Sequence, residues 1–456
     1  MSKNPTTRIS IRRFATAVLA AGAAAAVLPL ATVDSAAAAG GPTTYYFAPD
    51  GNDSNSGTSP DSPWKSIAKT EQIVLAPGDK VLLKRGGTYR GKLGIWRGGS
   101  AAKRLTVGAY GPSRAAKPVV TNSVDDFCVM IGASNVTVQD IKVQTCRVGV
   151  WVRGTDNLIT RIEATDNIHG IEVDAGSKRT KVLRNYLHHN DRMFSNTPGE
   201  FDDSGATGVV LVGDDSEVAY NKITDNWAPS EDFGTDGSAV EIYGGIGSVV
   251  HHNISRNNRT FTELGNNRSA DTTFAYNVAT SNLRDSEFLI TRGGNDYFGP
   301  VRGTVAANNT VKLTGANSRG FVCYAGCTPE LFAMYNNIFD VAGFIGNLEG
   351  TRAGGNNIYW RGNMWSVTLL PGDRVVDPNF NGPRLAIGRK SPAVDSGLSK
   401  ARFNRDARGR KVGVDGNGDG KRGRDIGAYE AKKKNKKAKN KGKRNSGKGK
   451  AIFIAS

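Results

Sequence analysis

Aromatic side chains, histidine and long apolar runs are all scarce in this sequence. Aromatic residues make up 8% and charged residues 22% of the 456 positions, whereas glycine occurs 56 times, well above its usual share of about 7%. This balance argues against a helical bundle and favours many short strands joined by turns. After the first forty residues no apolar run approaches the roughly 18 residues of a membrane-spanning helix. We therefore expect no membrane span in the mature chain.

Cysteine is scarce as well, with four residues in the whole chain. Cys323 and Cys327 are four positions apart and Cys128 and Cys146 are eighteen apart, so no second close pair completes a zinc site. We expect each of these two pairs to form a local disulfide, with free buried thiols as the alternative.

The excess of positive charge is confined mainly to the C-terminal end. The formal net charge is +18, of which +11 comes from ten lysines and one arginine between Lys432 and Lys450. The body is only mildly basic, which argues against a fold that binds nucleic acid sequence-specifically. We expect residues 431–456 to be a disordered Lys-rich tail that adheres to polyanions or cell-wall polymers, with a solubilising linker as the alternative.

The first residues have the pattern of a secretory signal peptide. Basic residues end at Arg12 and Arg13, an apolar segment follows to about Leu30, and small residues precede Gly40. We assign residues 1–39 to a signal peptide and expect a secreted protein, either free or associated with the cell wall, with a membrane anchor as the alternative. The paired arginines leave the twin-arginine export route open.

The body repeats one pattern of short strands. Segments such as SNVTVQDIKV, SEVAYNKITDN and TTFAYNVATSN end in Asn, and segments such as GIEVDAG, AVEIYGG and EFLITRGG lie between them. The matched asparagines are spaced 36, 32, 24, 31 and 28 residues apart and are Asn185, Asn221, Asn253, Asn277, Asn308 and Asn336. Such a period is typical of an architecture with one coil per repeat.

The pattern predicts an all-β, single-stranded right-handed parallel β-helix, a solenoid with loop insertions, over residues 40–430. No helical periodicity separates the strands, so they cannot form βαβ units. Each coil would pair with the next about 4.8 Å away, with the recurrent Asn facing inward at a turn where its amide bonds to the next coil. A β-propeller is less consistent, because its blades are antiparallel and longer.

Both ends of the body resemble a known superfamily. The segment YYFAPDGNDSNSGTSPDSPWKSIAKT with LAPGDKVLLKRGGTYRG, and the ending SPAVDSG with DIGAYE, resemble the secreted right-handed parallel β-helix proteins of the pectate-lyase-like superfamily. The resemblance covers Tyr45 to Glu430. It implies the fold and a carbohydrate substrate, since the superfamily contains lyases, hydrolases and epimerases that act on polysaccharides.

Two acidic insertions on consecutive repeats indicate where a functional groove lies. They are His189 to Gly208, with Asp202 and Asp203, and Asn226 to Ala239, with Asp236. The strands that follow carry Glu241 and Glu263, which are 22 residues apart, one coil. In register their carboxyl groups would be about 5 Å apart, where two anions require a shared proton or cation.

A second, weaker resemblance concerns Asp236 to Gly294. This stretch is similar in order to the chondroitinase B and alginate lyase family. The resemblance implies that Glu263 is a calcium ligand, that Arg268 stands where the family has its catalytic Lys, and that Arg292 matches its catalytic Arg. The sequence departs from the family at Phe261, which replaces an acidic residue, and at Glu241, which stands where the family has Arg.

Three functions remain open at this point. In β-elimination from a uronate polymer, Ca²⁺ on Glu241, Glu263 and Asp236 with Arg268 and Arg292 nearby would stabilise the developing enolate. Since Arg is a poor base, the proton acceptor would be Tyr243, His252 or a perturbed Arg268. In hydrolysis, the same carboxyl groups would act as acid and as base or nucleophile. The third function is glycan or cell-wall binding without catalysis.

These alternatives define the predicted site. The predicted catalytic residues are Asp236, Glu241, Glu263, Arg268 and Arg292. The predicted substrate-binding residues are Asp202, Asp203, Tyr243 and His252, and the substrate is a polysaccharide.

A separate loop has the spacing of a calcium site. Asp415, Asn417 and Asp419 alternate with glycines and are followed by Asp425 in place of the usual bidentate Glu. The spacing predicts that these four residues bind Ca²⁺ in a structural segment, 415–425, with a solvated turn as the alternative.

Overall fold

The computed structural model describes residues 41–199, 201–399 and 403–432. The predicted signal peptide and the tail from residue 433 onward lie outside the described residues. The described chain from Pro42 onward belongs to one compact unit. Among the described residues no helix is long and apolar enough to cross a membrane.

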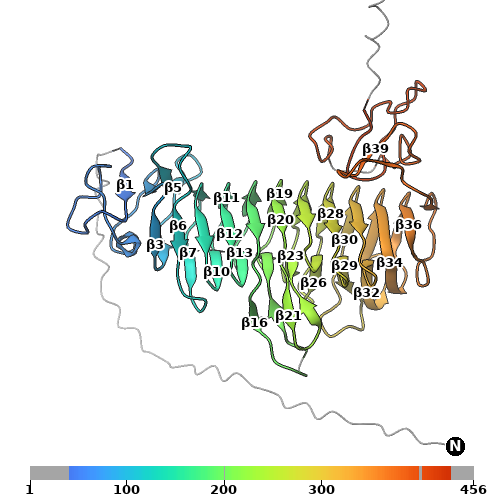
Figure 1. Ribbon diagram of the computed structural model, residues 1–456, viewed down its shortest axis with the longest axis horizontal. Coiled ribbons are helices and arrows are strands. Elements are labelled where there is room, and N and C mark those ends of the chain that lie inside the picture. The colour runs from blue at the N-terminus through green and yellow to red at the C-terminus, as the bar shows by residue number, and fades with distance from the viewer. Residues whose placement is uncertain (1–40, 200, 400–402, 433–456) are drawn as a thin grey trace, which may run out of the picture. The chain divides into compact units, whose positions relative to one another are not determined.

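The strands stack in three parallel columns, and each coil contributes one strand to each column in turn (Figure 1). The first stack consists of β1 (Thr44–Phe47), β2 (Lys80–Lys84), β5 (Leu105–Tyr110), β8 (Val136–Gln139), β11 (Leu158–Thr160), β14 (Lys181–Leu183), β19 (Glu217–Ala219), β24 (Val249–His251), β27 (Thr273–Ala275), β30 (Thr304–Ala307), β33 (Phe332–Tyr335) and β35 (Ala353–Gly355).

The second and third stacks meet in the long strand β34 (Ile338–Gly350), which pairs with both. The second stack consists of β3 (Thr88–Arg90), β6 (Val119–Thr121), β9 (Lys142–Gln144), β12 (Glu163–Thr165), β15 (Tyr186–His188), β20 (Lys222–Thr224), β25 (Ile254–Arg256), β28 (Val278–Ser281), β31 (Thr310–Leu313), β34, β36 (Ile358–Asn363) and β37 (Arg374–Val375). The third stack consists of β4 (Leu93–Ile95), β7 (Phe127–Ile131), β10 (Val148–Val152), β13 (His169–Val173), β18 (Thr207–Leu211), β23 (Ser238–Tyr243), β26 (Thr260–Gly265), β29 (Glu287–Arg292), β32 (Arg319–Cys327) and the end of β34.

This arrangement is the predicted right-handed parallel β-helix, and every ladder between its stacked strands is parallel. Among the strands of the described residues, the antiparallel pairs are three hairpins outside the stacks, and isolated antiparallel bridges occur in the C-terminal segment. They are β16 (Met193–Ser195) with β17 (Ser204–Gly205), β21 (Ala228–Ser230) with β22 (Gly234–Asp236), and β38 (Phe380–Asn381) with β39 (Ala386–Ile387). One 3-10 turn, η1 (Ile67–Glu71), precedes β2.

Inward side chains form a continuous core along the coils. In the first stack, Val138 is in register with Ile159, and this column continues through Val182 and Val218 to Val250. All five side chains are fully buried. Branched apolar residues suit such parallel strands, since they pack well on a pleated surface that is covered on its inner face.

A ladder of buried asparagines lies at the corner between the first and second stacks and fixes the register of each coil on the next. The Oδ1 atom of each Asn after the first accepts the backbone N–H and the Nδ2–H of the Asn one coil earlier, as between Asn253 and Asn221 at 3.0 Å each. Oδ1 of the first, Asn185, accepts the backbone N–H of Ile162. The ladder consists of Asn185, Asn221, Asn253, Asn277, Asn309, Asn337 and Asn357.

The predicted ladder was wrong by one position at its C-terminal end. Asn309 and Asn337 occupy the ladder, not Asn308 and Asn336. The left-handed conformation belongs to the residue before each ladder position, with φ of 55° at Asn308 and 57° at Asn336. Asn suits both the left-handed corner position and the ladder position, so in an Asn-Asn pair the sequence does not show which residue occupies which position.

Both predicted disulfides are present. Cys128 in β7 is bonded to Cys146 at the end of the next coil's β9 turn, and Cys323 to Cys327 within β32. The first bond links consecutive coils.

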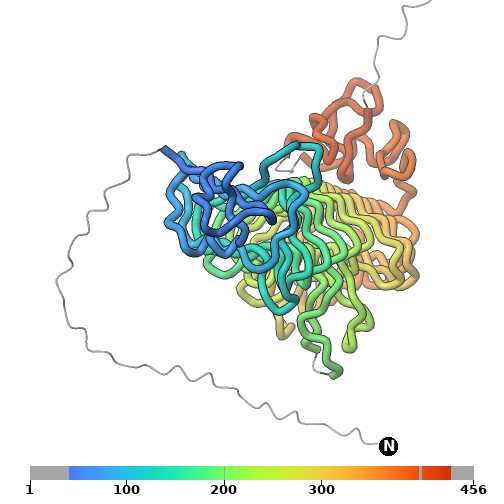
Figure 2. The backbone as a smooth tube through the Cα atoms, turned by 60° about the vertical axis from the view of Figure 1, so that its left-hand side comes forward, coloured from blue at the N-terminus to red at the C-terminus, as the bar shows by residue number. Residues whose placement is uncertain are grey.

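Beyond the last stacked strand, the C-terminal segment packs against the outside of the coils. Ile426 and Ala431 form an apolar cluster with Ile338 and Ile358, and Phe403 makes an edge-to-face contact with His252. In Figures 1 and 2 this orange segment lies along one edge of the stacked strands. It therefore covers the outside of some coils and leaves others open.

We expect Asn253→Ala to destabilise the fold strongly. The variant removes bonds to Asn221, Val218 and Asn277, and each buried group left without a partner costs about 1–3 kcal/mol. Urea unfolding should show a loss of about 3 kcal/mol or more. Asn282→Ala, at an exposed site, should change stability by less than about 0.5 kcal/mol. Equal effects of the two changes would refute a locking role for the ladder.

Candidate functional site

The outer face of the third stack carries the predicted pair of glutamates. Glu241 in β23 and Glu263 in β26 are direct register partners, so their Cα atoms are about 4.8 Å apart. Both side chains are partly exposed. The structure therefore brings together two residues whose placement on one exterior wall was predicted from a 22-residue spacing.

Arg292 at the end of β29 joins this wall. Its Nη2 lies 2.5 Å from Oε1 of Glu263, and its Nε lies 3.6 Å from Asp296. The Arg292 side chain is only 12% exposed, so this ion pair is largely shielded from water. Within the described residues Glu263 Oε2 has no hydrogen-bond partner, which leaves one oxygen available to a ligand.

Glu241 lies in a different electrostatic environment from Glu263. Burial, together with the nearby charges of Glu263 and Asp236, raises the pKa of Glu241 to about 8. Thr207 Oγ1 lies 3.4 Å from Glu241 Oε2. Burial and the charge of Glu263 also raise the pKa of Asp236, to about 7. Near neutral pH this wall therefore holds a protonated carboxyl group next to an ion-paired carboxylate.

The two acidic insertions are the hairpins β16–β17 and β21–β22, which project from neighbouring coils (Figure 2). Asp203 joins them. Its carboxylate accepts hydrogen bonds from Ser230 Oγ at 2.7 Å, from the Asp232 amide at 2.9 Å and from the Thr197 amide at 2.7 Å. β22 ends at Asp236, directly before β23. The hairpins are therefore anchored to each other beside the strand that carries Glu241.

The predicted substrate-binding aspartates have different surroundings. Asp203 is 6% exposed and is taken up by the contacts between the hairpins. Asp202 is exposed and accepts a hydrogen bond from Ser195 Oγ at 3.1 Å. Of the two, Asp202 alone presents a surface carboxylate beside the wall.

Two other predicted residues lie away from the glutamates. Arg268 binds Asp214 at 2.8 Å and the carbonyl groups of Val212 and Gly244. His252 lies at the corner between the first and second stacks, where its Nε2 is 3.1 Å from the Arg405 carbonyl. The structure does not bring Arg268 or His252 into contact with Glu241 or Glu263. Neighbouring positions in the sequence could not reveal Asp214 or Arg405 as partners, since both are more than fifty residues away.

Tyr243 lies next to the glutamates in β23 and is 40% exposed. Burial and the charge of Glu241 raise its pKa above the ordinary value. Its hydroxyl therefore stays protonated at neutral pH and suits hydrogen bonding to substrate better than accepting a proton.

The wall does not form a calcium cage. Among the described residues, Asp202, Asp203 and Asp232 form a set of three possible metal ligands whose oxygen atoms lie within 4.8 Å of one another. Asp236, Glu241 and Glu263 do not form such a group, and Arg292 occupies Oε1 of Glu263. This donor set does not fit Ca²⁺, and we derive no reaction step through it.

The predicted calcium loop binds its own backbone. Asp415 accepts the amides of Gly418 at 2.6 Å and Gly420 at 3.1 Å. Asn417 Oδ1 accepts the amide of Asp419 at 2.8 Å. Asp425 is buried, and its two oxygens accept the amides of Asp395 and Ala431. The geometry supports a structural clasp at Asp425, and calcium binding by the loop stays a prediction.

Two charged features of the wall were not predicted. Glu172 occupies the same strand position as Glu241 two coils earlier, and burial with the charge of Asp174 raises its pKa to about 7. Glu287 is buried between Arg259 and Arg319. The alignment of GIEVDAG with AVEIYGG could have indicated Glu172, whereas nothing in the sequence indicated the partners of Glu287.

Comparisons with known proteins support the fold and do not identify a reaction or a substrate. No family model matches the chain. A lacto-N-biosidase of Bifidobacterium longum subsp. longum is 38% identical over 77 residues, which is 16% of this chain and 5% of that protein.

Among solved structures, pectate lyase Pel9A has a TM-score of 0.57 at 15% identity, covering 86% of this chain and 96% of that one. The lacto-N-biosidase from Eubacterium ramulus has a TM-score of 0.53 at 16% identity, covering 74% and 67%. XylC, solved with xylose, has a TM-score of 0.55 at 12% identity, covering 85% and 98%. The chain therefore has a pectate-lyase-like parallel β-helix fold.

The raised pKa of Glu241 predicts how the stability of the folded state depends on pH. The folded state keeps this proton up to a pH of about 8, whereas the unfolded chain releases it near pH 4.3. Unfolding thus releases a proton between these values, and the contribution of Glu241 to stability falls as pH rises. We expect Glu241→Gln to unfold at a higher temperature than wild type at pH 8, with a smaller difference at pH 5.

Calorimetry at the two pH values tests this expectation, with the exposed Glu330→Gln as the matched change. A Tm difference between Glu241→Gln and wild type that is constant with pH, or larger at pH 5, would contradict the assigned environment.

Proposed function

We propose that this protein is an exported enzyme that hydrolyses glycosidic bonds in a polysaccharide. The observation that carries the proposal is the register pair on the outer wall, in which Glu241 retains a proton and Glu263 forms an ion pair with Arg292. Two carboxyl groups of opposite protonation state are what glycoside hydrolysis requires. The local similarity to a lacto-N-biosidase and the fold shared with carbohydrate-active proteins are consistent with it.

In this mechanism Glu241 acts as the general acid. Its proton passes to the glycosidic oxygen as the bond to the anomeric carbon breaks. Glu263 Oε2 attacks the anomeric carbon from the other side, and Arg292 orients the Glu263 carboxylate through their ion pair. The Glu241 carboxylate next takes a proton from water, and the resulting hydroxide releases the sugar from Glu263.

The separation of the two strands favours retention of configuration. Carboxyl groups are about 5–5.5 Å apart in retaining enzymes and about 6.5–9.5 Å apart in inverting ones. Register partners in neighbouring strands fall near the first range.

β-Elimination, the first of the predicted reactions, has weaker support in this geometry. Arg268 is bound to Asp214, His252 lies at another corner of the coil, and the raised pKa of Tyr243 disfavours its deprotonation. None of the three proposed proton acceptors is therefore positioned and charged for that role.

We expect Glu241→Gln and Glu263→Gln each to lower kcat by about 10²–10⁴-fold, the usual contribution of a positioned acid or base. In wild type, kcat/KM should fall as pH rises above about 8, where Glu241 loses its proton. The control Glu330→Gln, at an exposed position, should retain wild-type rates. An active Glu241→Gln with an unchanged pH profile would remove Glu241 from the reaction.

A panel of uronate-containing and neutral polysaccharides, each with and without chelator, separates the alternatives. We expect reducing ends to appear without unsaturated-product absorbance and without dependence on chelator. Absorbance that rises and is abolished by chelator would replace hydrolysis with elimination, and polymer binding without new reducing ends would indicate a binding protein. NMR of the first product should show retained anomeric configuration.

A further inference from the structure

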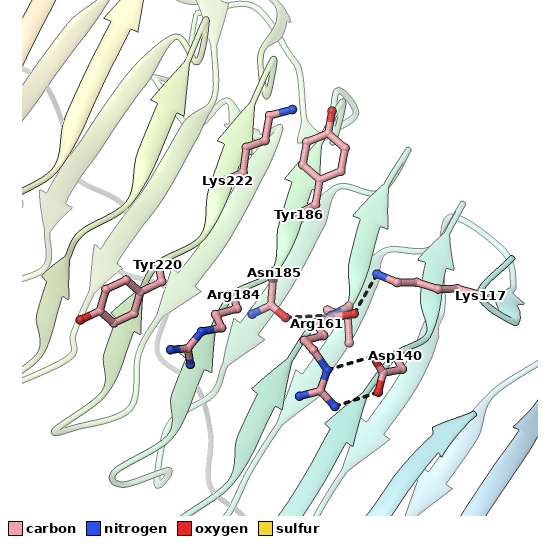
Figure 3. A pocket seen from close by; sticks show the side chains of 9 residues that line it. Lys117, Asp140, Arg161, Arg184, Asn185, Tyr186, Tyr220 and Lys222 are labelled. Carbon is pink, nitrogen blue, oxygen red and sulfur yellow. Dashed lines mark hydrogen bonds and ion pairs between the residues drawn. The ribbon is translucent and has the colours of Figure 1, made fainter. Parts of the chain in front are cut away.

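A pocket lies on a different side of the coils from the outer face of the third stack, which carries Glu241 and Glu263. It occupies the corner between the first and second stacks, which the third stack does not reach, and has a volume of about 480 Å³. The lining residues are Lys117, Asp140, Arg161, Ile162, Arg184, Asn185, Tyr186, Tyr220 and Lys222 (Figure 3). Four of them are cationic and one is anionic.

The stacked corner positions build this pocket. Arg161, Arg184 and Tyr220 each precede a ladder position or its equivalent in successive coils and have φ of 54°, 58° and 59°. This left-handed conformation turns the chain sharply at the corner, and all three side chains are exposed there. Lys222 and Tyr186 are register partners in the second stack. Side chains from distant parts of the sequence thus line one surface strip.

The cations of the pocket differ in their partners. Arg161 is neutralised by Asp140, with hydrogen bonds of 3.0 and 2.8 Å. Lys117 donates to the Arg161 carbonyl at 2.8 Å, and burial lowers its pKa. Arg184 and Lys222 have no ion pair with a carboxylate in the described part of the chain. Three of the four cations therefore lack a carboxylate partner among the described residues, and of these three Arg184 and Lys222 are exposed.

Both of these cations lie over tyrosine rings. The Arg184 guanidinium carbon is 5.3 Å from the ring centre of Tyr220, and Lys222 Nζ is 4.2 Å from that of Tyr186. Cation–π contacts hold the charges in place without neutralising them. In Figure 3 each of these cation–tyrosine pairs lies on neighbouring strands along the same side of the coils.

The C-terminal segment ends the strip. His252, the next corner residue after Tyr220, has its ring 5.1 Å from that of Tyr220 and is covered by Phe403 and Arg405. The covered coils begin where the tyrosine–cation pairs stop. The open strip is therefore short, about 19 Å for the four coil steps from Lys117 to Lys222 at the spacing of parallel strands.

We propose that this strip is a binding site for an anionic glycan, separate from the catalytic wall. Carboxylate or sulfate groups supply the missing counter-ions of Arg184 and Lys222, and Arg binds such planar anions in a bidentate manner. Tyr220 and Tyr186 offer flat apolar surfaces with a polar edge, on which sugar rings can pack. A single nucleic-acid strand is a poorer occupant, because sites for such strands commonly cover about 4–16 nucleotides. The site would hold the enzyme on an acidic polymer while the wall acts on a chain.

Calorimetric titration of the full-length mature protein with tetragalacturonate tests the site. We expect Arg184→Gln/Lys222→Gln to bind at least tenfold more weakly than wild type. We expect Tyr220→Ala to bind about fivefold more weakly with an unchanged salt dependence, because no charge is lost. The matched double variant Arg97→Gln/Lys103→Gln removes the same charge from exposed positions elsewhere and should change affinity less than twofold.

The remaining outcomes are as informative. Equal weakening by both double variants would mean that overall charge, including the Lys-rich tail, accounts for binding, and would overturn the proposal. So would tight binding of the neutral methyl ester, or binding of a tetranucleotide that depends on Arg184 and Lys222 more strongly than sugar binding does. A sulfated tetrasaccharide that binds best, with the same dependence, would support the site and identify sulfate as its anion. Unchanged rates of the Arg184→Gln/Lys222→Gln variant on a short substrate would support the separation of strip and wall.

Discussion

The hydrogen bonds between stacked asparagines are the constraint on which the rest of this structure depends. Each ladder Asn bonds to the coil before it and the coil after it, as Asn253 does with Asn221 and Asn277. A parallel strand that slipped by one residue would turn its inward side chains outward. The buried ladder prevents this slip, because a displaced amide would leave several polar groups without partners. The same register sets Glu241 beside Glu263 on the outside.

That enforced register makes an unfavourable electrostatic arrangement persist. Two carboxylates at the separation of neighbouring strands repel each other, and partial burial adds a desolvation penalty. The structure accommodates both terms by leaving the proton on Glu241 and pairing Glu263 with Arg292. A reactive pair of this kind lowers the free energy of unfolding. The β-helix tolerates this decrease because it arises at one pair of residues, whereas the stabilising contacts extend over all the coils. The same reasoning accounts for the buried Glu287, which lies between two arginines.

The sequence predicted the repeating architecture well, because each coil carries its own copy of the signal. Strand alternation, the recurrent Asn and the spacing of Glu241 and Glu263 are local or periodic features, and the structure agrees with all three. The Asn-Asn pair at 308–309 was assigned one position early, since neither residue type nor spacing separates a left-handed corner from the ladder position that follows it.

The parts that could not be predicted depend on side chains that meet across coils in ways the period does not encode. Arg268 was placed in the site by the resemblance to the chondroitinase B and alginate lyase family, but Asp214 from another turn binds it. His252 was expected near the substrate, but the C-terminal segment, 153 residues further on at Arg405, covers it. Such partners are set by how loops and the final segment fold over a regular body. Prediction from a repeat is therefore most reliable for positions inside the stacks and least reliable at turns.

The two outer surfaces illustrate how one scaffold produces opposite chemistry. A position repeated in every coil becomes a row of side chains at the spacing of parallel strands, so a few substitutions within one row give a continuous charged strip. On the third stack the row includes Glu172, Glu241 and Glu263, and burial together with nearby carboxylates raises the pKa of Glu172 and of Glu241. At the opposite corner the row includes Arg161, which is paired with Asp140 one coil earlier, and Arg184, which lies over the ring of Tyr220 one coil later. Like charges are thus tolerated in both rows for different reasons, by retaining a proton in one and by pairing each arginine with a carboxylate or an aromatic ring in the other. This difference explains why the acidic row suits proton transfer, whereas the basic row, which cannot lose its charge near neutral pH, suits binding.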